Sequence, residues 1–293
     1  MKKILLIAAL LLMTAPHAYA GLNVVATLPW IGSVAKSVGG DRVDVKTLVK
    51  PGQDPHYIEA KPSMILAVRD ADVLMFNGLD LEIGYLPVLI ESSRNALVQP
   101  GQPGNFDCSS FIRVLDKPTS VDRSMGDVHP LGNPHYHYSP SRVLKVAEGM
   151  AGELSRIDPA GAGYYNSKLK AFSAKMAEKR KQWAAVPLKG RRYVAYHRLF
   201  EYLASEFGFS ITGYVEPKPG IPPSAGHIGE LIGTMKAARP DGILVSAAYG
   251  KDEAESLSDR TGAPAIVLPN DVGSAKPGQD WFSFLDDVIS DLR

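Results

Sequence analysis

Two stretches of this chain repeat the same order of turn, helix and strand, and this repeat constrains the fold more than any other feature. The first is LVKPGQDPHYIEAKPSMILAVRDADVLMFNG at residues 48–78, and the second is YVEPKPGIPPSAGHIGELIGTMKAARPDGILVSAA at residues 214–248. Each passes through a Pro-Gly turn, enters a helix at a Pro-Ser pair and ends in a short apolar strand. Because strands that alternate with helices form mostly parallel sheets, the repeat predicts an α/β fold with two βα lobes of similar plan.

The segments around the repeat extend the same alternation. In the first half we expect helices at 31–40 and 62–70, between strands at residues 22–30, 44–52 and 71–78. In the second half we expect helices at 199–208 and 224–240, a further helix before the last strand, and strands at residues 191–197, 211–220, 241–248 and 264–271.

A long amphipathic segment separates the two halves. Its apolar residues recur at steps of four, three, four and seven, which is one helical stripe: Tyr165, Leu169, Phe172, Met176 and Trp183. A helix over residues 160–185 would be about 35–40 Å long at about 1.5 Å per residue. We interpret it as a linking helix at 159–187 between lobes at 21–158 and 188–293; the alternative is an ordinary surface helix within one lobe.

The first twenty residues have the pattern of a cleavable signal peptide. Lys2 and Lys3 precede ten apolar residues, and the small residues Ala18 and Ala20 flank Tyr19 before the expected cut. Ten apolar residues are too few to span a bilayer, which needs about 20. There is no cysteine at the expected cleavage point to carry a lipid anchor, so we expect an export signal at 1–20 and a free periplasmic protein.

Composition excludes several classes of function. Removing the two leader lysines from 32 basic residues leaves 30 against 31 acidic residues, a balance that disfavours nucleic acid or an anionic membrane surface as partner. Cys108 is the only cysteine, so a disulfide within the chain and a cysteine zinc site are both excluded. Any bound metal would have to be held by nitrogen and oxygen.

Histidines and one aspartate fall where strands end. His56 follows the second strand, His197 ends the strand at 191–197, and Asp271 ends the strand at 264–271. A histidine cluster, HPLGNPHYHYSP at 129–140, precedes a helix that begins near Ser139. Ligands of open parallel α/β sheets bind outside the carboxyl ends of the strands, and three imidazoles with one carboxylate suit an ion such as zinc. These positions therefore predict a metal site between the lobes.

Five features in this order and at these separations carry a resemblance to a known family: the leader, DPHYIEAKPS, GNPHYHYSP, AYHRLFEYLASEFG and LPND. The chain resembles the metal-binding solute receptors of ABC importers, the TroA/ZnuA-like zinc and manganese receptors, over essentially all of its length after the leader. The resemblance implies two βα lobes joined by one long helix, with the metal in the cleft between them. It also implies the ligands His56, His135, His197 and Asp271.

The same resemblance implies a partner and a cargo. The receptor would be a monomer without a membrane span of its own, and it would deliver a divalent ion to an ABC permease of the inner membrane. We expect zinc, with manganese or ferrous iron as alternative cargoes, because nitrogen-rich four-coordinate sites favour zinc. His129 and His137 are expected beside the ligands or facing solvent.

This sequence departs from the family pattern beside two ligands. YHYSP follows His135 in place of an aromatic-Leu-Asp-Pro run, and Arg198 replaces a common acidic residue. The long histidine-rich loop of zinc-specific members is replaced by LDKPTSVDRSMGDVHPLG at 115–132.

Two other classes of function remain to be compared. A hydrolase could use the metal with Glu59 or Glu201 as general base, and a receptor for an organic solute could carry incidental histidines. The chain has no His-Glu-x-x-His and no Gly-x-Ser-x-Gly sequence, and four protein ligands leave little room for a reactive water. We therefore expect a binding protein and not an enzyme.

Overall fold

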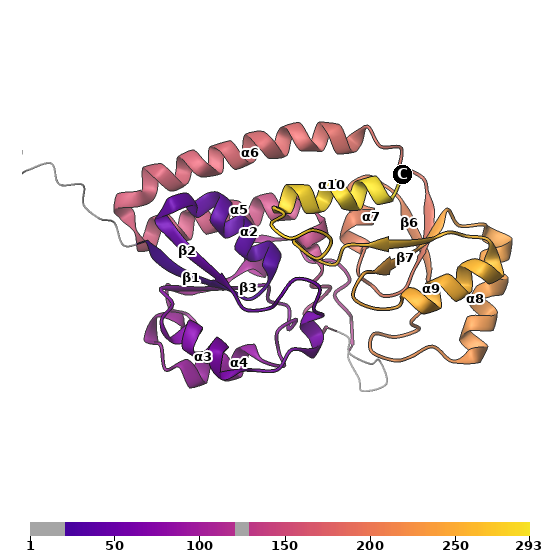
Figure 1. The fold of residues 1–293 in the computed structure, drawn as a ribbon, viewed down its shortest axis with the longest axis horizontal. Helices are drawn as coiled ribbons and strands as arrows, with labels where there is room; N and C mark the ends of the chain where they lie inside the picture. Colours follow the sequence, from indigo (N-terminus) through magenta and orange to yellow (C-terminus); the bar gives the residue numbers. More distant parts are fainter. Residues whose placement is uncertain (1–20, 121–128) are drawn as a thin grey trace, which may run out of the picture.

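Two parallel sheets of four strands each form the centre of the structure, a computed structural model that describes residues 21–120 and 129–293 (Figure 1). The first sheet has the order β2-β1-β3-β4, with β1 at Leu22–Ala26, β2 at Val43–Thr47, β3 at Val73–Phe76 and β4 at Asn105–Asp107. The second has the order β6-β5-β7-β8, with β5 at Arg192–Ala195, β6 at Ser210–Tyr214, β7 at Gly242–Ser246 and β8 at Ala265–Leu268. The predicted signal peptide at 1–20 lies outside the described residues.

The pairing of the strands confirms the predicted fold class. In the first sheet β1 lies between β2 and β3, and Val24 pairs with Val45 on one side and Val73 on the other. In the second sheet β5 occupies the equivalent place between β6 and β7. All six pairings are parallel, as expected for strands that alternate with helices.

Helices cover the sheets in both halves. The helices of the first half are α2 (Pro29–Gly39), α3 (Pro62–Arg69), α4 (Leu86–Ser93) and α5 (Pro140–Ile157). Those after the linking segment are α7 (Glu201–Phe207), α8 (Ala225–Ala238), α9 (Lys251–Thr261) and α10 (Trp281–Asp291). Single 3₁₀ turns lie at Gly40–Arg42, Pro55–Tyr57, Ala96–Val98, Cys108–Phe111, Tyr136–Tyr138 and Pro159–Gly161.

The first helix begins two residues earlier than the sequence pattern indicated. Pro29 and Trp30, which we expected to end a strand, form the first turn of α2. Proline suits this position because its fixed φ matches the helix and its missing N–H would have no partner there. The shift matters for the core, since Trp30 is fully buried.

The long helix expected over residues 160–185 is observed as α6, at Ala162–Ala184. Four residues of its predicted stripe are buried, namely Tyr165, Phe172, Met176 and Trp183, and Leu169 packs beside them. The helix lies along α2 and α5 of the first half and also contacts α10, which follows the second sheet (Figure 1). Its contacts therefore include one helix that follows the second sheet as well as two helices of the first half.

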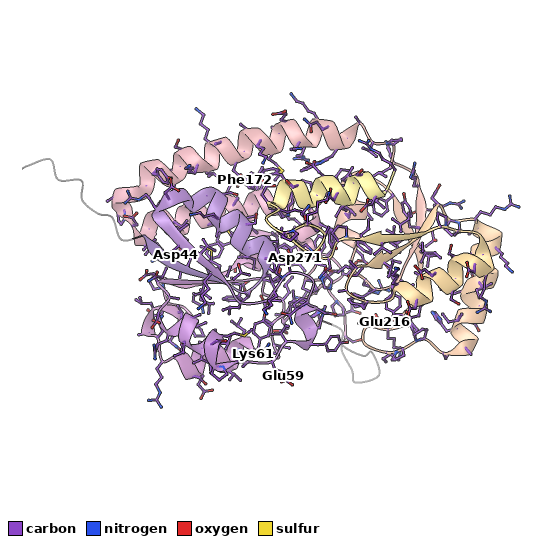
Figure 2. The ribbon with its side chains drawn as sticks, in the orientation of Figure 1. Asp44, Glu59, Lys61, Phe172, Glu216 and Asp271 are labelled. Atoms are coloured by element: carbon purple, nitrogen blue, oxygen red, sulfur yellow. The ribbon has the colours of Figure 1, made fainter. Side chains whose placement is uncertain are left out.

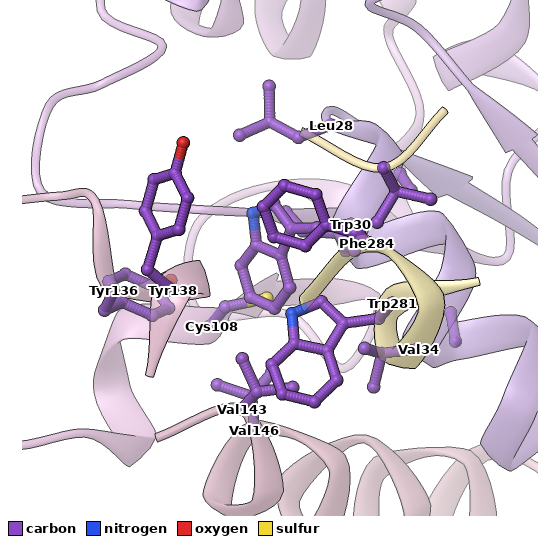
Figure 3. Packing of buried hydrophobic residues seen from close by; sticks show 14 of the residues in the cluster. Leu28, Trp30, Val34, Cys108, Tyr136, Tyr138, Val143, Val146, Trp281 and Phe284 are labelled. Atoms are coloured by element: carbon purple, nitrogen blue, oxygen red, sulfur yellow. The ribbon is translucent and has the colours of Figure 1, made fainter. Parts of the chain in front are cut away.

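The C-terminal helix α10 returns to the first half of the molecule. Trp281 donates from its indole N–H to the His137 carbonyl at 2.9 Å, and Trp183 of α6 donates to Asp286 at 2.8 Å. Figure 3 shows Trp281 and Phe284 packed beside Trp30 among residues from α2, α5 and the Tyr136–Tyr138 turn. One buried cluster thus contains side chains from both sheets and from α6 and α10. Among the described residues, no helix is both long and apolar enough to cross a bilayer.

Candidate metal centre

Three of the four predicted ligands converge where the two halves meet. His56 lies in the turn that follows β2, His135 in the loop before α5, and His197 two residues after β5 ends. Their ring centroids are 5.2 Å apart for His56 and His135, 5.5 Å for His135 and His197, and 5.9 Å for His56 and His197. These spacings bring three imidazoles from three separate segments around one point.

The His56 ring is oriented by a carboxylate two residues before it. Asp54 caps the short Pro55–Tyr57 turn by accepting from the His56 backbone N–H at 3.0 Å, and the same oxygen lies 2.6 Å from Nδ1 of the ring. Burial raises the pKa of Asp54, but the hydrogen bonds and the electrostatic effect of His56 lower it by a larger amount. The net shift of the Asp54 pKa is therefore downward. Asp54 therefore holds a proton on Nδ1 and leaves Nε2 of His56 free for a metal.

His197 has the same kind of partner in the other half. Its Nδ1 lies 2.5 Å from Oε2 of Glu216, and the other oxygen of Glu216 accepts from the Gly220 backbone N–H at 2.8 Å. Glu216 follows β6, which lies next to β5 in the sheet, and Figure 2 shows its position in the second half. This contact likewise engages Nδ1 with a carboxylate, so Nε2 is the ring nitrogen of His197 that can bind a metal.

His135 is the most enclosed of the three. It is buried, and among the described residues its Nε2 is a buried ring nitrogen without a hydrogen-bond partner. Its backbone N–H donates to the Asn133 side chain at 2.9 Å, and the Asn133 amide donates to the Arg198 carbonyl beside His197, also at 2.9 Å. Because an unpaired buried polar atom is costly, this nitrogen fits a position that a bound cation would satisfy.

His129 belongs to the same cluster. Its Nε2 lies 3.0 Å from Nε2 of His56, and its ring centroid is 6.1 Å from that of His135. One ring nitrogen of each of His56, His129 and His135 lies within 4.8 Å of the other two. His129 therefore lies beside the predicted ligands, one of the two positions expected for it, and does not face solvent.

Asp271 lies in the wall of the adjoining pocket. It shares that pocket with His56 and His135, and its Oδ1 accepts from the Val272 backbone N–H at 2.6 Å. Figure 2 shows it where the two halves meet. Burial raises the pKa of Asp271 to about 8 in the metal-free protein, and a cation beside it would favour the ionised carboxylate.

Burial keeps the imidazoles of His129 and His135 neutral, which is the state that binds metal. Burial, followed by the charges of neighbouring histidines, lowers the pKa of His129 to about 3 and the pKa of His135 well below its ordinary value. Both rings are consequently neutral at pH 7, and neutral imidazole is the form that donates a lone pair to a cation.

His137 is not a member of the cluster and does not face solvent. Its ring is buried, stacked between Trp30 and Phe284 at centroid distances of 6.4 and 5.9 Å. Its Nε2 donates to the Asn270 carbonyl at 3.0 Å. His137 is thus a core residue that contacts the chain immediately before Asp271.

The two glutamates considered as general bases have other environments. Glu59 is exposed, and Figure 2 shows it at the lower edge of the first half, away from Asp271. Glu201 is partly buried and accepts from the Tyr214 hydroxyl at 2.7 Å and from the Asn133 amide at 3.3 Å. Glu201 therefore links Tyr214 of β6 to the loop that carries Asn133 through hydrogen bonds.

The sequence analysis did not identify Asp54 and Glu216 as residues of the site, and it did not include His129 in the ligand set. Asp54 had a local signal, since an aspartate two residues before a histidine at a Pro turn can accept from its backbone. Glu216 and His129 had no such signal, because their partners lie 19 and 73 residues away along the chain.

Comparison with known proteins identifies the family of this chain. Residues 24–293 match the model of one family, described as ZnuA, zinc-uptake complex component A, periplasmic. The iron ABC transporter substrate-binding lipoprotein MtsA of Streptococcus pyogenes serotype M1 is 24% identical over 271 residues, covering 90% of this chain and 85% of that protein. The iron-binding protein YfeA of Yersinia pestis is 28% identical over 250 residues, covering 82% and 74%. The manganese-binding lipoprotein MntA of Halalkalibacterium halodurans is 25% identical over 246 residues, covering 83% and 76%.

Solved structures share the fold. A crystal structure of ZnuA superposes with a TM-score of 0.75 at 24% identity, covering 92% of this chain and 96% of that one. A cadmium-bound periplasmic metal binding protein from Candidatus Liberibacter asiaticus gives a TM-score of 0.74 at 22% identity, covering 92% and 97%. A family model matches nearly the whole length of this chain, and this match confirms the resemblance drawn from the sequence motifs. This chain therefore belongs to the ZnuA family of zinc-uptake components.

Proposed function

We propose that this protein is an extracytoplasmic receptor that binds a divalent metal ion and delivers it to an ABC-type importer. The ion would be held by His56, His135 and His197, with Asp271 supplying a carboxylate. Membership of the ZnuA family supports the transport role, and the relatives named above are substrate-binding proteins of such importers or metal-binding proteins.

The observation that carries this proposal is the convergence of three imidazoles whose Nε2 atoms are the ring nitrogens left for a metal. His56 and His197 each have Nδ1 held by a carboxylate, and His135 has a buried Nε2 without a partner among the described residues. A cluster for an organic solute would use such nitrogens as hydrogen-bond donors or acceptors at several separate points. Here the rings gather at one point, as metal coordination requires.

We propose zinc as the ion bound most tightly. Imidazole nitrogen suits zinc, whereas manganese is better matched by oxygen-rich sites, and zinc exceeds manganese in the general affinity order of divalent ions. The names of the relatives include iron and manganese, so these ions are the alternative cargoes.

We also propose the division of the chain and its location. The export signal would occupy residues 1–20, the lobes 21–158 and 188–293, and the linking segment 159–187, with α10 packed across the division. The mature protein would be a periplasmic monomer, and an inner-membrane permease would be its partner.

Metal analysis followed by a competition titration tests the proposal. The purified protein, stripped with a chelator, should bind one equivalent of zinc, and excess zinc should displace manganese. A crystal structure of the loaded protein should place the ion between His56, His135 and His197. Absence of stoichiometric metal binding would contradict the receptor function, and turnover of esters or phosphoesters by the zinc form would favour the hydrolase.

A further inference from the structure

A fourth imidazole, that of His129, approaches the centre although the predicted ligand set does not include it. The Nε2 atoms of His129 and His56 are 3.0 Å apart, and the His129 ring is edge-on to that of His135, with an interplanar angle of 84°. Two nitrogens bound to one zinc ion at about 2.0–2.1 Å in a tetrahedral shell lie about 3.3 Å apart. The observed separation is close to that value.

The hydrogen-bond chemistry of this contact favours a shared cation. Asp54 holds the proton of His56 on Nδ1, so Nε2 of His56 presents a lone pair. Nε2 of His129 lies directly opposite this lone pair, so a hydrogen bond between the two rings requires a proton on Nε2 of His129. With its proton on Nδ1 instead, His129 would present a second lone pair at the same point, and a cation could bind both nitrogens.

A defined turn places His129 beside His135. The His129 carbonyl accepts from the Gly132 backbone N–H at 3.1 Å, and the Asn133 backbone N–H is bonded to the Leu115 carbonyl at 2.9 Å. Gly132 has a φ of 112°, and a Cβ there would lie 2.9 Å from the Leu115 carbonyl oxygen. Only glycine fits this turn without strain, so the backbone itself directs His129 toward the cluster.

We propose that His129 is a direct ligand of the metal ion, so that the site contains four imidazoles and not three. This inference rests on the proposed receptor function and adds a residue that determines metal specificity. A fourth nitrogen makes the site poorer for manganese, which prefers oxygen, and better for zinc. The chain would thereby achieve zinc selectivity without a long histidine-rich loop, using one histidine of the 115–132 segment.

Two measurements on three proteins test this proposal. The proteins are the wild type, His129→Ala, and His227→Ala as control, because His227 bonds to the Tyr214 carbonyl and lies outside the cluster. A crystal structure of the zinc-loaded wild type should place Nε2 of His129 about 2.0–2.1 Å from the ion. In competition titrations, His129→Ala should bind zinc about tenfold or more weakly than the wild type, and its loss of affinity for manganese should be smaller. The control His227→Ala should bind zinc as tightly as the wild type.

Rescue separates lost coordination from a damaged fold. Added imidazole should restore part of the zinc affinity of His129→Ala, while His129→Gln, which keeps the bulk of the side chain, should remain weak. The proposal is overturned if His129 lies beyond bonding distance in the loaded crystal, or if zinc affinity in His129→Ala stays within about twofold of wild type. Either result with normal wild-type binding refutes only the role of His129, whereas a wild type that binds no metal refutes the receptor function.

Discussion

His137 donates a hydrogen bond from Nε2 to the Asn270 carbonyl at 3.0 Å, and so ties the segment that carries His135 to the segment that carries Asp271. The next residue reinforces the contact, because the Tyr138 hydroxyl donates to the Pro269 carbonyl at 2.7 Å. Two consecutive side chains thus hold two consecutive carbonyls directly before the predicted carboxylate ligand.

Replacing His137 with Phe should weaken metal binding while the fold is kept. Phenylalanine retains the stack between Trp30 and Phe284 but cannot donate to the Asn270 carbonyl. Residues that orient ligands typically change metal affinity by about 10–100-fold, so we expect a loss near the lower end of that range. Zinc competition measures the loss, and Tyr138→Phe, which removes the neighbouring donor, should lower affinity in the same direction. Wild-type affinity in both variants would show that these bonds do not position Asp271.

Replacing either His56 or His197 with Ala should reduce zinc affinity by about tenfold or more, because each removes one nitrogen donor. Both lie in loops at strand ends, so the metal-free variants should fold normally. Thermal melting with and without zinc checks both points, since a ligand that binds only the folded state raises the melting temperature. A variant whose melting temperature still rises with zinc as much as that of the wild type would remove that histidine from the ligand set.

Glu82 should make the stability of the metal-free protein depend on pH. Its carboxyl group is buried and accepts from the Thr27 hydroxyl and from the backbone N–H groups of Asn77 and Gly78. These bonds lower its pKa, but burial outweighs them and raises the pKa from 4.5 to about 7. The folded state therefore binds more protons than the unfolded state between these pH values, so stability falls as pH rises from about 4.5 to about 7.

Comparison with Glu82→Gln isolates this effect from the titration of the histidines. Relative to the variant, the wild type should lose about 3 kcal/mol of unfolding free energy across that interval, with a flat difference above it. Urea denaturation at several pH values, with a chelator present, measures the difference. Parallel stability curves for the two proteins would show that Glu82 has the same pKa in the folded and unfolded states.

Metal release should leave the overall dimensions of the protein nearly unchanged. The continuous helix α6 packs along the first half and contacts α10, which limits hinge motion to small tilts and loop rearrangement. Solution scattering of the metal-free and zinc-loaded protein should give radii of gyration within about 1 Å of each other. A difference of several ångström would mean that α6 bends or swings.

Local patterns made most of the fold predictable. Apolar runs separated by Pro-Gly turns indicated the three longer strands of the first sheet and all four of the second, and helical spacing indicated α6. The strand β4 has only three residues, too few to show a period. The helices α4 and α10 were also not predicted, although the apolar residues of α10 have helical spacing. The contacts of α10 with α2 and α6 are long-range, and a pattern within one segment does not reveal them.

The candidate site shows the same limit. His56 and His197 could be placed because each follows a strand, and the resemblance singled out His135 from its neighbours. The role of His129 could not, because its approach to His56 depends on the turn at Gly132 and on how the lobe folds around it. Glu216 could not either, since only the pairing of β5 with β6 brings it to His197.

The buried cluster that joins both sheets has a consequence for how the chain gains and loses its structure. Leu74 of the first sheet, Leu244 and Leu268 of the second, and Trp281 of α10 belong to one continuous core. Neither half can bury these side chains alone, so a fragment ending before β5 would expose part of its interior and aggregate. Heating should melt the two lobes together in one cooperative transition, and metal bound at their junction would protect the whole chain from proteases.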